Sequence, residues 1–431
     1  MKVRRAVISA SLINAASKAA AWILSVYLAS FFLSERGDDA FAIFAIIQSG
    51  ALVGCLLDLG ASAAFLEYSA SLAGGEVVLK RVFAVCLRRT IQGILVGAIA
   101  MFGGLVIGFL YIDVVQINFG LLMALAVSCL FSGFGQIVGL LQKIQSLELR
   151  DYRVTLSSLL ASILATLIVA YLVVNTEVKS EYLALVYVAG GVIFQFVLAA
   201  VFIGWKRLCS LFLSFYARTV EAIGMEQDLA NYGIRFSFVS VTSVVGNALD
   251  VILIGGILAS SDVSRYSVGY RLFIGVQAAQ LSVNQLWPII ASRWSSGRHA
   301  DRMKMIALLY GISLLLASVM AGIALCITNG FGLIPGLGVV SFTRAELWGF
   351  FLFSVSSGVG GISSMLAYRS NLIGGLIKIQ LIWCVCMVVL KLIAGSYFGL
   401  VGFIWTIVFV NYFLFHAPIV FHLFRSKNIA L

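Results

Sequence analysis

The sequence predicts an all-α integral membrane protein with about twelve transmembrane helices, arranged as two six-helix pseudo-repeats around a central cavity. Three observations predict this fold class: the composition, the length of the apolar runs and the placement of the basic residues. Hydrophobic residues make up 61% of the 431 residues and charged residues 11%, against about 25% charged in a typical soluble domain. A chain of this composition could not hide its apolar side chains in water. Composition therefore excludes a soluble globular enzyme, a disordered chain and a disulfide scaffold.

The apolar runs are long enough to cross a bilayer, which takes about 20 residues of helix. Short polar loops separate them, and they define twelve predicted spans: 6–33, 40–73, 83–111, 116–142, 154–175, 182–204, 230–258, 265–292, 305–330, 345–366, 376–396 and 399–424. Several spans exceed the minimum length, which predicts tilt, kinks or extension beyond the bilayer. The first span is too long for the apolar core of a signal peptide, so we expect it to be uncleaved.

The longest stretch between spans, residues 205–229, predicts a cytoplasmic linker between an N-terminal half, residues 1–204, and a C-terminal half, residues 230–431. Short similarities between the halves indicate an internal duplication. Phe131–Gly135 in the fourth span resembles Ser356–Gly360 in the tenth, and Leu28–Ser30 in the first resembles Leu258–Ser260 in the seventh. Two parallel repeats of this kind are related by an axis along the membrane normal.

The basic residues predict the topology. If the N-terminus is cytoplasmic, most of the 29 lysines and arginines fall in cytoplasmic segments, and the opposite side holds only Arg36, Lys179, Arg265 and Arg344. Cytoplasmic loops of membrane proteins carry such an excess, so we expect both termini in the cytoplasm. The basic residues of the cytoplasmic segments also account for the net charge of +11. Because the charge is explained in this way, we expect no nucleic-acid partner.

Four predicted spans each carry a polar stripe along one helical face or a buried charge. These are Ser11, Asn14, Lys18 and Ser25 in the first span, Gln48, Asp58 and Glu67 in the second, Ser240, Ser243, Asn247 and Asp250 in the seventh, and Tyr270, Arg271, Gln277, Gln280 and Asn284 in the eighth. Because polar faces do not face lipid, they predict a hydrophilic cavity lined by these spans. The alternative is that they join helices, for example as a Lys18–Asp250 or Lys18–Asp58 pair.

The remaining polar residues give weaker signals. Arg235, Arg88 and Arg89 lie near cytoplasmic span ends, where they serve topology or form a cationic entrance to the cavity. We expect Lys391 to extend its ammonium group to the membrane surface. The glycine- and serine-rich runs of the fourth and tenth spans indicate close helix packing rather than hinges.

Signals of catalysis and of metal binding are missing from the sequence. The seven cysteines lie mostly in apolar runs, and His299, His416 and His422 lie in loops or near the C-terminal end without metal-ligand spacing. No nucleotide-binding or hydrolase motif occurs. We therefore expect no enzyme activity, no cofactor and no metal.

Several stretches resemble one transporter family, the Wzx-type O-antigen repeat-unit flippases. This family is the polysaccharide-transport branch of the multidrug/oligosaccharidyl-lipid/polysaccharide exporter superfamily. The stretches are Leu57–Ala64 at the end of the second span, Asn247–Gly255 in the seventh, and Tyr266–Phe273 and Leu286–Pro288 in the eighth. The resemblance implies a V-shaped, alternating-access transporter that moves an undecaprenyl-diphosphate-linked oligosaccharide from the cytoplasmic to the periplasmic leaflet, for O-antigen, lipopolysaccharide or other surface polysaccharide synthesis.

The resemblance also implies partners, and the polar residues suit them. The partners are the lipid-linked oligosaccharide diphosphate, membrane lipid, H⁺ or Na⁺, and other membrane proteins of polysaccharide assembly. We expect the diphosphate and sugar to contact the cations and amides of the cavity, namely Lys18, Arg235, Arg271, Asn14, Asn247, Gln277, Gln280 and Asn284. Asp58 and Asp250 are the expected ion-coupling acids. Two alternatives stay open: a cation-coupled multidrug exporter of the same superfamily, and a membrane enzyme of glycan assembly.

Overall fold

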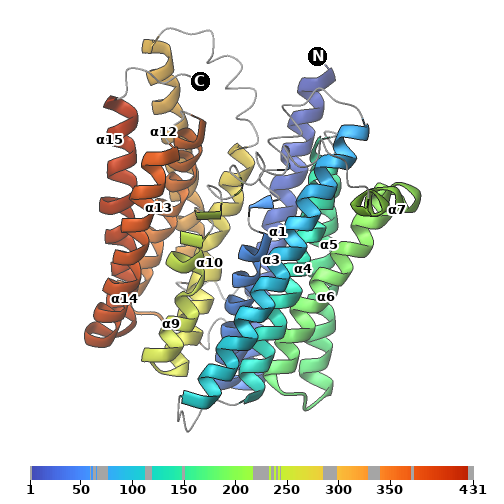
Figure 1. The fold of residues 1–431 in the computed structure, drawn as a ribbon. Helices are drawn as coiled ribbons and strands as arrows, with labels where there is room; N and C mark the ends of the chain where they lie inside the picture. Colours follow the sequence, from blue (N-terminus) through green and yellow to red (C-terminus); the bar gives the residue numbers. More distant parts are fainter. Residues whose placement is uncertain are drawn as a thin grey trace. The chain divides into compact units, whose positions relative to one another are not determined.

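The computed structural model is almost entirely helical, and no β-strand occurs among the residues it describes (Figure 1). It describes the backbone of residues 2–425, except 59, 62–64, 66–75, 112–118, 148–150, 217–232, 234–236, 239–240, 243, 285–298, 329–339 and 370–372. Arg235 and Glu67 lie outside the described residues. The prediction of an all-helical protein is confirmed for the described part of the chain.

Six helical stretches of the described residues are long and apolar enough to cross a membrane. They are Ala16–Asp58, Val77–Ile99, Gly120–Gln145, Tyr152–Asn175, Ser180–Ile203 and Ile377–Phe421. Two shorter apolar helices cover Val244–Ile257 and Tyr310–Cys326. Their number and length indicate a multi-pass membrane protein. The full count of twelve spans stays a prediction.

Two of these stretches contain a sharp turn at a glycine. Gly37 interrupts helix α1 (Lys2–Ala51) with a φ of 78°, and Gly399 interrupts helix α14 (Ile373–Val410) with a φ of 62°. Glycine adopts positive φ without the steric cost of a Cβ. The turns fall where the sequence separates the first span from the second and the eleventh from the twelfth, so each long helix is a pair of predicted spans.

The helices form two compact units, each described by itself. The N-terminal bundle comprises Ile43–Ile252, and the C-terminal bundle comprises Met1–Ala42 with Leu253–Leu431. These units differ in membership from the halves 1–204 and 230–431, because the first span packs with the C-terminal helices. The two six-helix repeats are inferred from similarity between the halves of the sequence. The packing units do not test that similarity, so the repeats stay a prediction.

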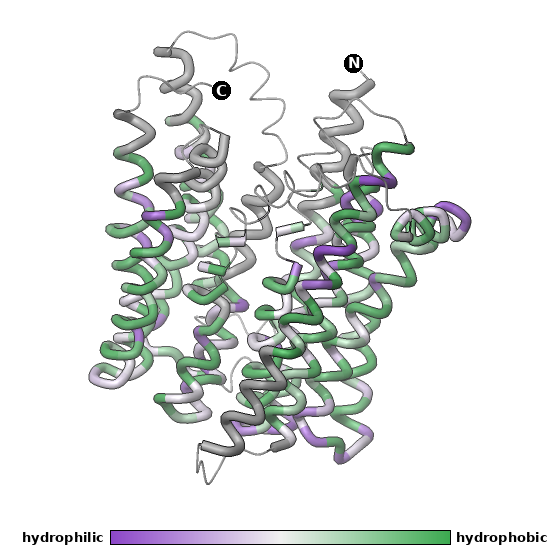
Figure 2. The backbone as a smooth tube through the Cα atoms, viewed as in Figure 1, coloured by the Kyte–Doolittle hydropathy of each residue, from purple (hydrophilic) through white to green (hydrophobic). Residues whose placement is uncertain are grey.

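The N-terminal bundle consists mainly of four long helices that lie side by side: α3 (Glu76–Tyr111), α4 (Phe119–Leu147), α5 (Asp151–Asn175) and α6 (Ser180–Ile203) (Figure 1). Hydrophobic residues cover most of the length of α4, α5 and α6, as Figure 2 shows. Aromatic rings interlock in its core, where Phe83 meets Phe65 edge-on at 6.2 Å and Phe212 at 6.1 Å between ring centroids. The apolar character of both faces suits helices that contact neighbours and lipid.

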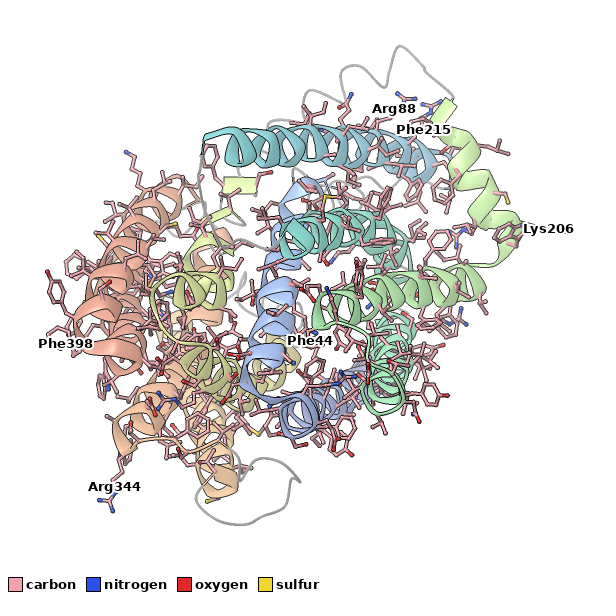
Figure 3. All side chains as sticks on the ribbon, turned by 90° about the horizontal axis from the view of Figure 1, so that it is seen from below. Phe44, Arg88, Lys206, Phe215, Arg344 and Phe398 are labelled. Atoms are coloured by element: carbon pink, nitrogen blue, oxygen red, sulfur yellow. The ribbon has the colours of Figure 1, made fainter. Side chains whose placement is uncertain are left out.

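A short amphipathic helix, α7 (Trp205–Leu213), begins the predicted linker and lies across the end of α6 (Figure 1). Gly204, with a φ of 89°, provides the bend between the two helices. Arg88 of α3 donates hydrogen bonds of 3.2 and 2.6 Å to the carbonyl oxygen of Phe215 and lies 5.6 Å from its ring centroid (Figure 3). Arg88 therefore fixes the start of the linker to α3, which is a structural role.

The C-terminal bundle is built around helix α13 (Arg344–Arg369). It packs against α10 (Ser260–Asn284), α12 (His299–Thr328) and α14, and against the π-helical segment η5 (Asn411–His416), which continues into α15 (Ala417–Arg425). Tyr266 lies 5.7 Å from both Phe350 and Phe403 between ring centroids. A Cβ on Gly269 would lie 2.4 Å from the Phe350 ring, so this glycine permits the close approach of α10 to α13.

The expectation for Lys391 is wrong. This side chain is fully buried, with a relative exposure of 0%, and its Nζ lies 5.5 Å from the ring centroid of Phe403. The turn at Gly399 folds the next helix back over the lysine, and a Cβ on Gly402 would lie only 2.5 Å from the carbonyl oxygen of Ala394. Because the two helices approach so closely, Phe403 covers the ammonium group with an aromatic face.

Candidate substrate and ion site

Two of the predicted substrate cations, Lys18 and Arg271, lie in the C-terminal bundle on helices that touch. Trp22 Nε1 donates a hydrogen bond of 2.7 Å to the carbonyl oxygen of Arg271. Arg271 Nη1 donates in turn to the carbonyl and hydroxyl oxygens of Ser25, at 3.4 and 3.2 Å. These bonds join α1 to α10 at one level of the bundle.

The spacing along α1 brings Lys18 to the same side as these contacts. Lys18, Trp22 and Ser25 are separated by four and three residues, so they share a helical face. Seven residues of α-helix rise about 10 Å, which sets the distance along α1 between Lys18 and Ser25, the residue bonded to Arg271. Both cations are half-buried. Lys18 and the residue that Arg271 contacts, Ser25, therefore lie on one face of α1.

Arg271 is held in place from a second side. Its guanidinium lies 5.9 Å from the ring centroid of Phe41, near the start of the second predicted span. A cation over an aromatic face is attracted by the ring quadrupole. Ser25 and Phe41 thus orient the guanidinium, whereas the sequence had indicated neither residue as a partner.

The other predicted substrate residues are only partly described. Helix α10 is continuous through Asn284, so Gln277, Gln280 and Asn284 keep the helical register that the sequence predicts. Asn14 lies in α1, and Asn247 lies in the π-helical segment η3 (Val244–Ala248). The side chains of these five residues, and all of Arg235, lie outside the described part of the structure. Their roles stay predictions.

The predicted coupling acids, Asp58 and Asp250, both lie in the N-terminal bundle and are both buried. Their relative exposures are 7% and 1%. Asp58 ends the 3₁₀ segment η1 (Leu52–Asp58), and Asp250 begins helix α9 (Asp250–Ile257) directly after η3. The segments η1 and η3 pack against each other. The fold therefore places two irregular helical segments side by side: η1 ends at Asp58, and η3 ends two residues before Asp250.

The conformation of Gly60 explains how the turn after Asp58 approaches the seventh predicted span. Gly60 has a φ of 71°, and its backbone N–H donates a hydrogen bond of 2.8 Å to the Asp58 carboxylate. A Cβ on Gly60 would lie 2.2 Å from the carbonyl oxygen of Gly233, which also accepts a 2.9 Å hydrogen bond from the Ser237 hydroxyl. Gly60 therefore allows the turn after Asp58 to touch the backbone of the seventh predicted span.

The irregular segments suit ion binding. Short 3₁₀ and π stretches interrupt the regular backbone ladder and are frequent at functional sites, and broken transmembrane helices coordinate ions in many transporters. Cys86 of α3, which is fully buried, experiences the charges of both Arg89 and Asp58. The Lys18–Asp58 and Lys18–Asp250 pairs stay predictions.

The described residues contain no group of three or more histidine, cysteine, aspartate or glutamate side chains that could hold a metal ion. The C-terminal bundle offers cations suited to an anion. The N-terminal bundle offers carboxylates suited to a proton or a small cation.

No family model matches the chain, and no curated protein matches its sequence. Solved transporter structures match its fold. An inward-facing multidrug resistance MATE family transporter of the MOP superfamily matches with a TM-score of 0.59 and 14% identity, covering 96% of this chain and 98% of that chain. The lipid II flippase MurJ in an inward closed conformation matches with a TM-score of 0.63 and 14% identity, covering 98% and 88%. The MATE multidrug transporter DinF-BH matches with a TM-score of 0.60 and 14% identity, covering 99% and 96%.

The chain therefore has a fold similar to that of these multidrug transporters and of this lipid flippase. The transporter fold that the resemblance in the sequence implies agrees with this likeness. At 14% identity the likeness shows the fold alone, and substrates are argued from the chain's own residues.

Proposed function

We propose that this chain is a flippase that moves an undecaprenyl-diphosphate-linked oligosaccharide repeat unit from the cytoplasmic to the periplasmic leaflet by alternating access. The observation that carries the proposal is the pair of half-buried cations, Lys18 and Arg271, on the joined faces of α1 and α10. Cations inside apolar spans are costly and usually functional. A drug exporter that takes organic cations has no use for two such charges on its substrate path.

The chemistry of the pair suits a diphosphate. A sugar diphosphate is anionic and polar, and it crosses lipid unaided only at high cost. Arginine binds phosphate with two parallel hydrogen bonds, while lysine binds it as a point charge. Each charge-assisted contact contributes about 1.5–3 kcal/mol, a factor of roughly 10–150 in affinity. Two dispersed contacts of this size bind the head group and still release it.

The remaining parts of the proposal follow from the sequence. Arg235 at the cytoplasmic side receives the diphosphate first, and Asn14, Asn247, Gln277, Gln280 and Asn284 replace water around the sugar. The lipid tail stays in the bilayer between helices. Both termini are cytoplasmic, the membrane is the bacterial inner membrane, and the product serves O-antigen, lipopolysaccharide or related polysaccharide synthesis beside other assembly proteins. Asp58 and Asp250 exchange H⁺ or Na⁺ during the cycle.

A cation-coupled multidrug exporter is the second candidate. It is favoured by the buried acids Asp58 and Asp250 and by the fold shared with the MATE multidrug transporters. The two candidates differ in the charge of the substrate, so one experiment separates them.

The experiment reconstitutes the purified protein into liposomes that contain undecaprenyl diphosphate carrying a fluorescent oligosaccharide. A membrane-impermeant quencher then reports how much label has moved between leaflets. We expect rapid movement of this lipid and no uptake of a fluorescent organic cation under an imposed H⁺ or Na⁺ gradient. Uptake of the organic cation without movement of the lipid contradicts the proposal and supports the exporter.

A further inference from the structure

His416 is a buried histidine whose two ring nitrogens have no hydrogen-bond partner among the described residues. Its relative exposure is 6%, and it lies within the apolar stretch Ile377–Phe421. Buried polar side chains are nearly always hydrogen-bonded, so an imidazole with two unsatisfied nitrogens inside a membrane segment calls for an explanation. The sequence pattern indicated no role for it.

The backbone around His416 is irregular for a local reason. The segment η5 is a π-helix, in which the N–H of Ala417 donates to the carbonyl oxygen of Tyr412, five residues earlier. Proline follows at position 418, and it lacks an N–H and clashes with the carbonyl four residues before it. Pro418 therefore disfavours regular α-helical bonding just after His416. A π-helix and an α-helix differ by one residue of register, which turns a side chain to a different neighbour.

The neighbouring helix leaves room for the imidazole at one glycine. A Cβ on Gly360 of α13 would lie 2.5 Å from Cε1 of His416, 3.4 Å from Nε2 and 3.5 Å from Nδ1. The backbone of Ser356, one turn earlier in α13, lies near the imidazole ring but forms no hydrogen bond with it. The rings of Tyr412 and Phe415 cover it at centroid distances of 6.0 and 5.2 Å.

His416 lies in η5, which packs against α13 and α14. Most of the titratable groups buried in these elements contact residues other than His416. Tyr412 in η5 donates a hydrogen bond to the carbonyl oxygen of Leu352 at 3.4 Å, and Glu346 in α13 forms a salt bridge with Arg265 at 3.3 Å. In α14, Lys391 lies against Phe403, and Cys384 is the remaining buried group. His416 forms no salt bridge in the part of the chain that the structure describes.

An imidazolium in this pocket would have no charged partner, so the cation is favoured only when the ring reaches water or a new acceptor. An arrangement of η5 that brings the ring to water would hold the proton more tightly than the arrangement beside Gly360 does.

We propose that His416 is a proton-binding site of the C-terminal bundle, which takes up a proton when η5 rearranges and releases it when the ring returns beside Gly360. This deepens the proposed function, on which it rests, by naming a coupling residue separate from Asp58 and Asp250. A proton taken up on one side of the membrane and released on the other would drive the carrier cycle.

The first test reads the proton directly. The chain has only 3 histidines, so a protein labelled with ¹³C and ¹⁵N at histidine gives a simple NMR spectrum, and loss of one signal in His416→Asn assigns it. We expect this signal to stay neutral between about pH 5 and 8 while the ring lies beside Gly360, and to take up a proton within this range when undecaprenyl diphosphate is added as the probe. A signal that stays neutral across this range, with and without the probe, overturns the proposal.

The second test measures movement of the fluorescent lipid-linked oligosaccharide in liposomes at several pH values. We expect the rate of wild-type protein to depend on pH, that of His416→Asn to lose this dependence, and that of the matched control His422→Asn to keep it. If His416 titrates but the variant keeps the wild-type pH profile, the coupling role is overturned. If the wild-type protein moves no lipid at any pH, the proposed function fails together with the coupling role, and the NMR titration still decides whether His416 binds a proton.

Discussion

Lys18 and Arg271 are held differently, although both are half-buried cations of one bundle. The guanidinium of Arg271 is oriented by Ser25 and Phe41. Lys18 extends from the face of α1 that also carries Ser25, and its ammonium group has no planar set of donors that must be aligned. Arginine with a fixed fork is suited to geometric recognition, and lysine to a charge that moves with its ligand. This difference predicts that the two residues tolerate substitution differently.

We expect Lys18→Ala and Arg271→Ala each to lose most movement of the lipid-linked oligosaccharide, by about 10-fold or more, because each removes a charge-assisted contact worth about 1.5–3 kcal/mol. Lys18→Arg should retain part of the rate, since it keeps the charge. The liposome assay measures these rates. Lys206→Ala is the control, because Lys206 is exposed on α7 and points away from the bundle (Figure 3).

The double variant Lys18→Ala with Asp250→Ala separates a substrate role from a structural one. If Lys18 binds the diphosphate, the double variant is at least as impaired as Lys18→Ala alone. Recovery of transport in the double variant would show that Lys18 only neutralises a buried acid, which contradicts the substrate role.

Asp250 is predicted to take part in ion coupling. The Asp250→Asn substitution keeps the size of the buried side chain and removes its charge, so we expect folded protein without ion-driven transport. The measurement is the lipid movement rate with and without an H⁺ or Na⁺ gradient, with the exposed Asp39→Asn as control. A normal rate with normal ion dependence in Asp250→Asn would remove Asp250 from the coupling mechanism.

At the scale of elements, glycines set where the irregular segments meet. Gly60 permits the contact of the Asp58 turn with the backbone at Gly233, and Gly360 makes room for His416 beside η5. At Gly54, a Cβ would lie 2.2 Å from the carbonyl oxygen of Cys129, so η1 packs on α4 backbone to backbone. In the glycine-rich runs of the fourth and tenth spans, a Cβ on Gly133 would lie 2.9 Å from Leu57 and one on Gly360 would lie 2.5 Å from His416. These two glycines agree with the close packing that the sequence predicts for those spans.

We expect Gly60→Ala to destabilise the protein strongly, because the substitution combines a positive φ, which costs about 1–2 kcal/mol for a residue with a Cβ, with a backbone clash at 2.2 Å. The matched control is Gly322→Ala in α12, where nothing lies within 4 Å and alanine favours the helix. Thermal unfolding in detergent measures both. Equal unfolding temperatures for the two variants would argue against the tight contact at Gly60.

The sequence predicted elements well where length and period decide them. Apolar run length placed the boundaries at the turns of Gly37 and Gly399, because a span ends where the bilayer ends. Helical period placed Lys18 and Ser25 on one face. The helical spacing of residues does not show which helix, distant in the sequence, packs on the face of α1 that carries Lys18 and Ser25. The contacts of Arg271 with Ser25 and Phe41 were therefore missed. The same limit explains why the burial of Lys391 and His416 was not foreseen.

At the scale of the whole molecule, the first span belongs to the C-terminal bundle although it begins the chain. Similarity between the two halves of the sequence indicates a duplication. The packing of a helix is decided separately, by which other helices its side chains contact. The chain passes from one bundle to the other between Ala42 and Ile43, shortly after the turn at Gly37. The membrane orientation of both bundles is the remaining prediction at this scale.

Lys179 and Lys206 flank α6 and are both exposed, which makes them a matched pair for topology. In a protein without its seven native cysteines, we expect Lys179→Cys to react with an impermeant thiol reagent added outside the cell, and Lys206→Cys to react only after the membrane is broken, because basic residues gather on the cytoplasmic side. The opposite pattern would reverse the orientation and the assignment of Arg235 to the cytoplasmic side.

The central claim is that Lys18 and Arg271 bind the diphosphate of a lipid carrier, and head-group-dependent binding tests it most directly. Binding of undecaprenyl diphosphate and of uncharged undecaprenol is measured on the purified wild-type protein and on the double variant Lys18→Ala/Arg271→Ala. The account predicts that the wild-type protein binds the diphosphate at least about 10-fold more tightly than the alcohol, and that the double variant loses this preference. Equal binding of both lipids by the wild-type protein, or an unchanged preference in the double variant, would contradict it.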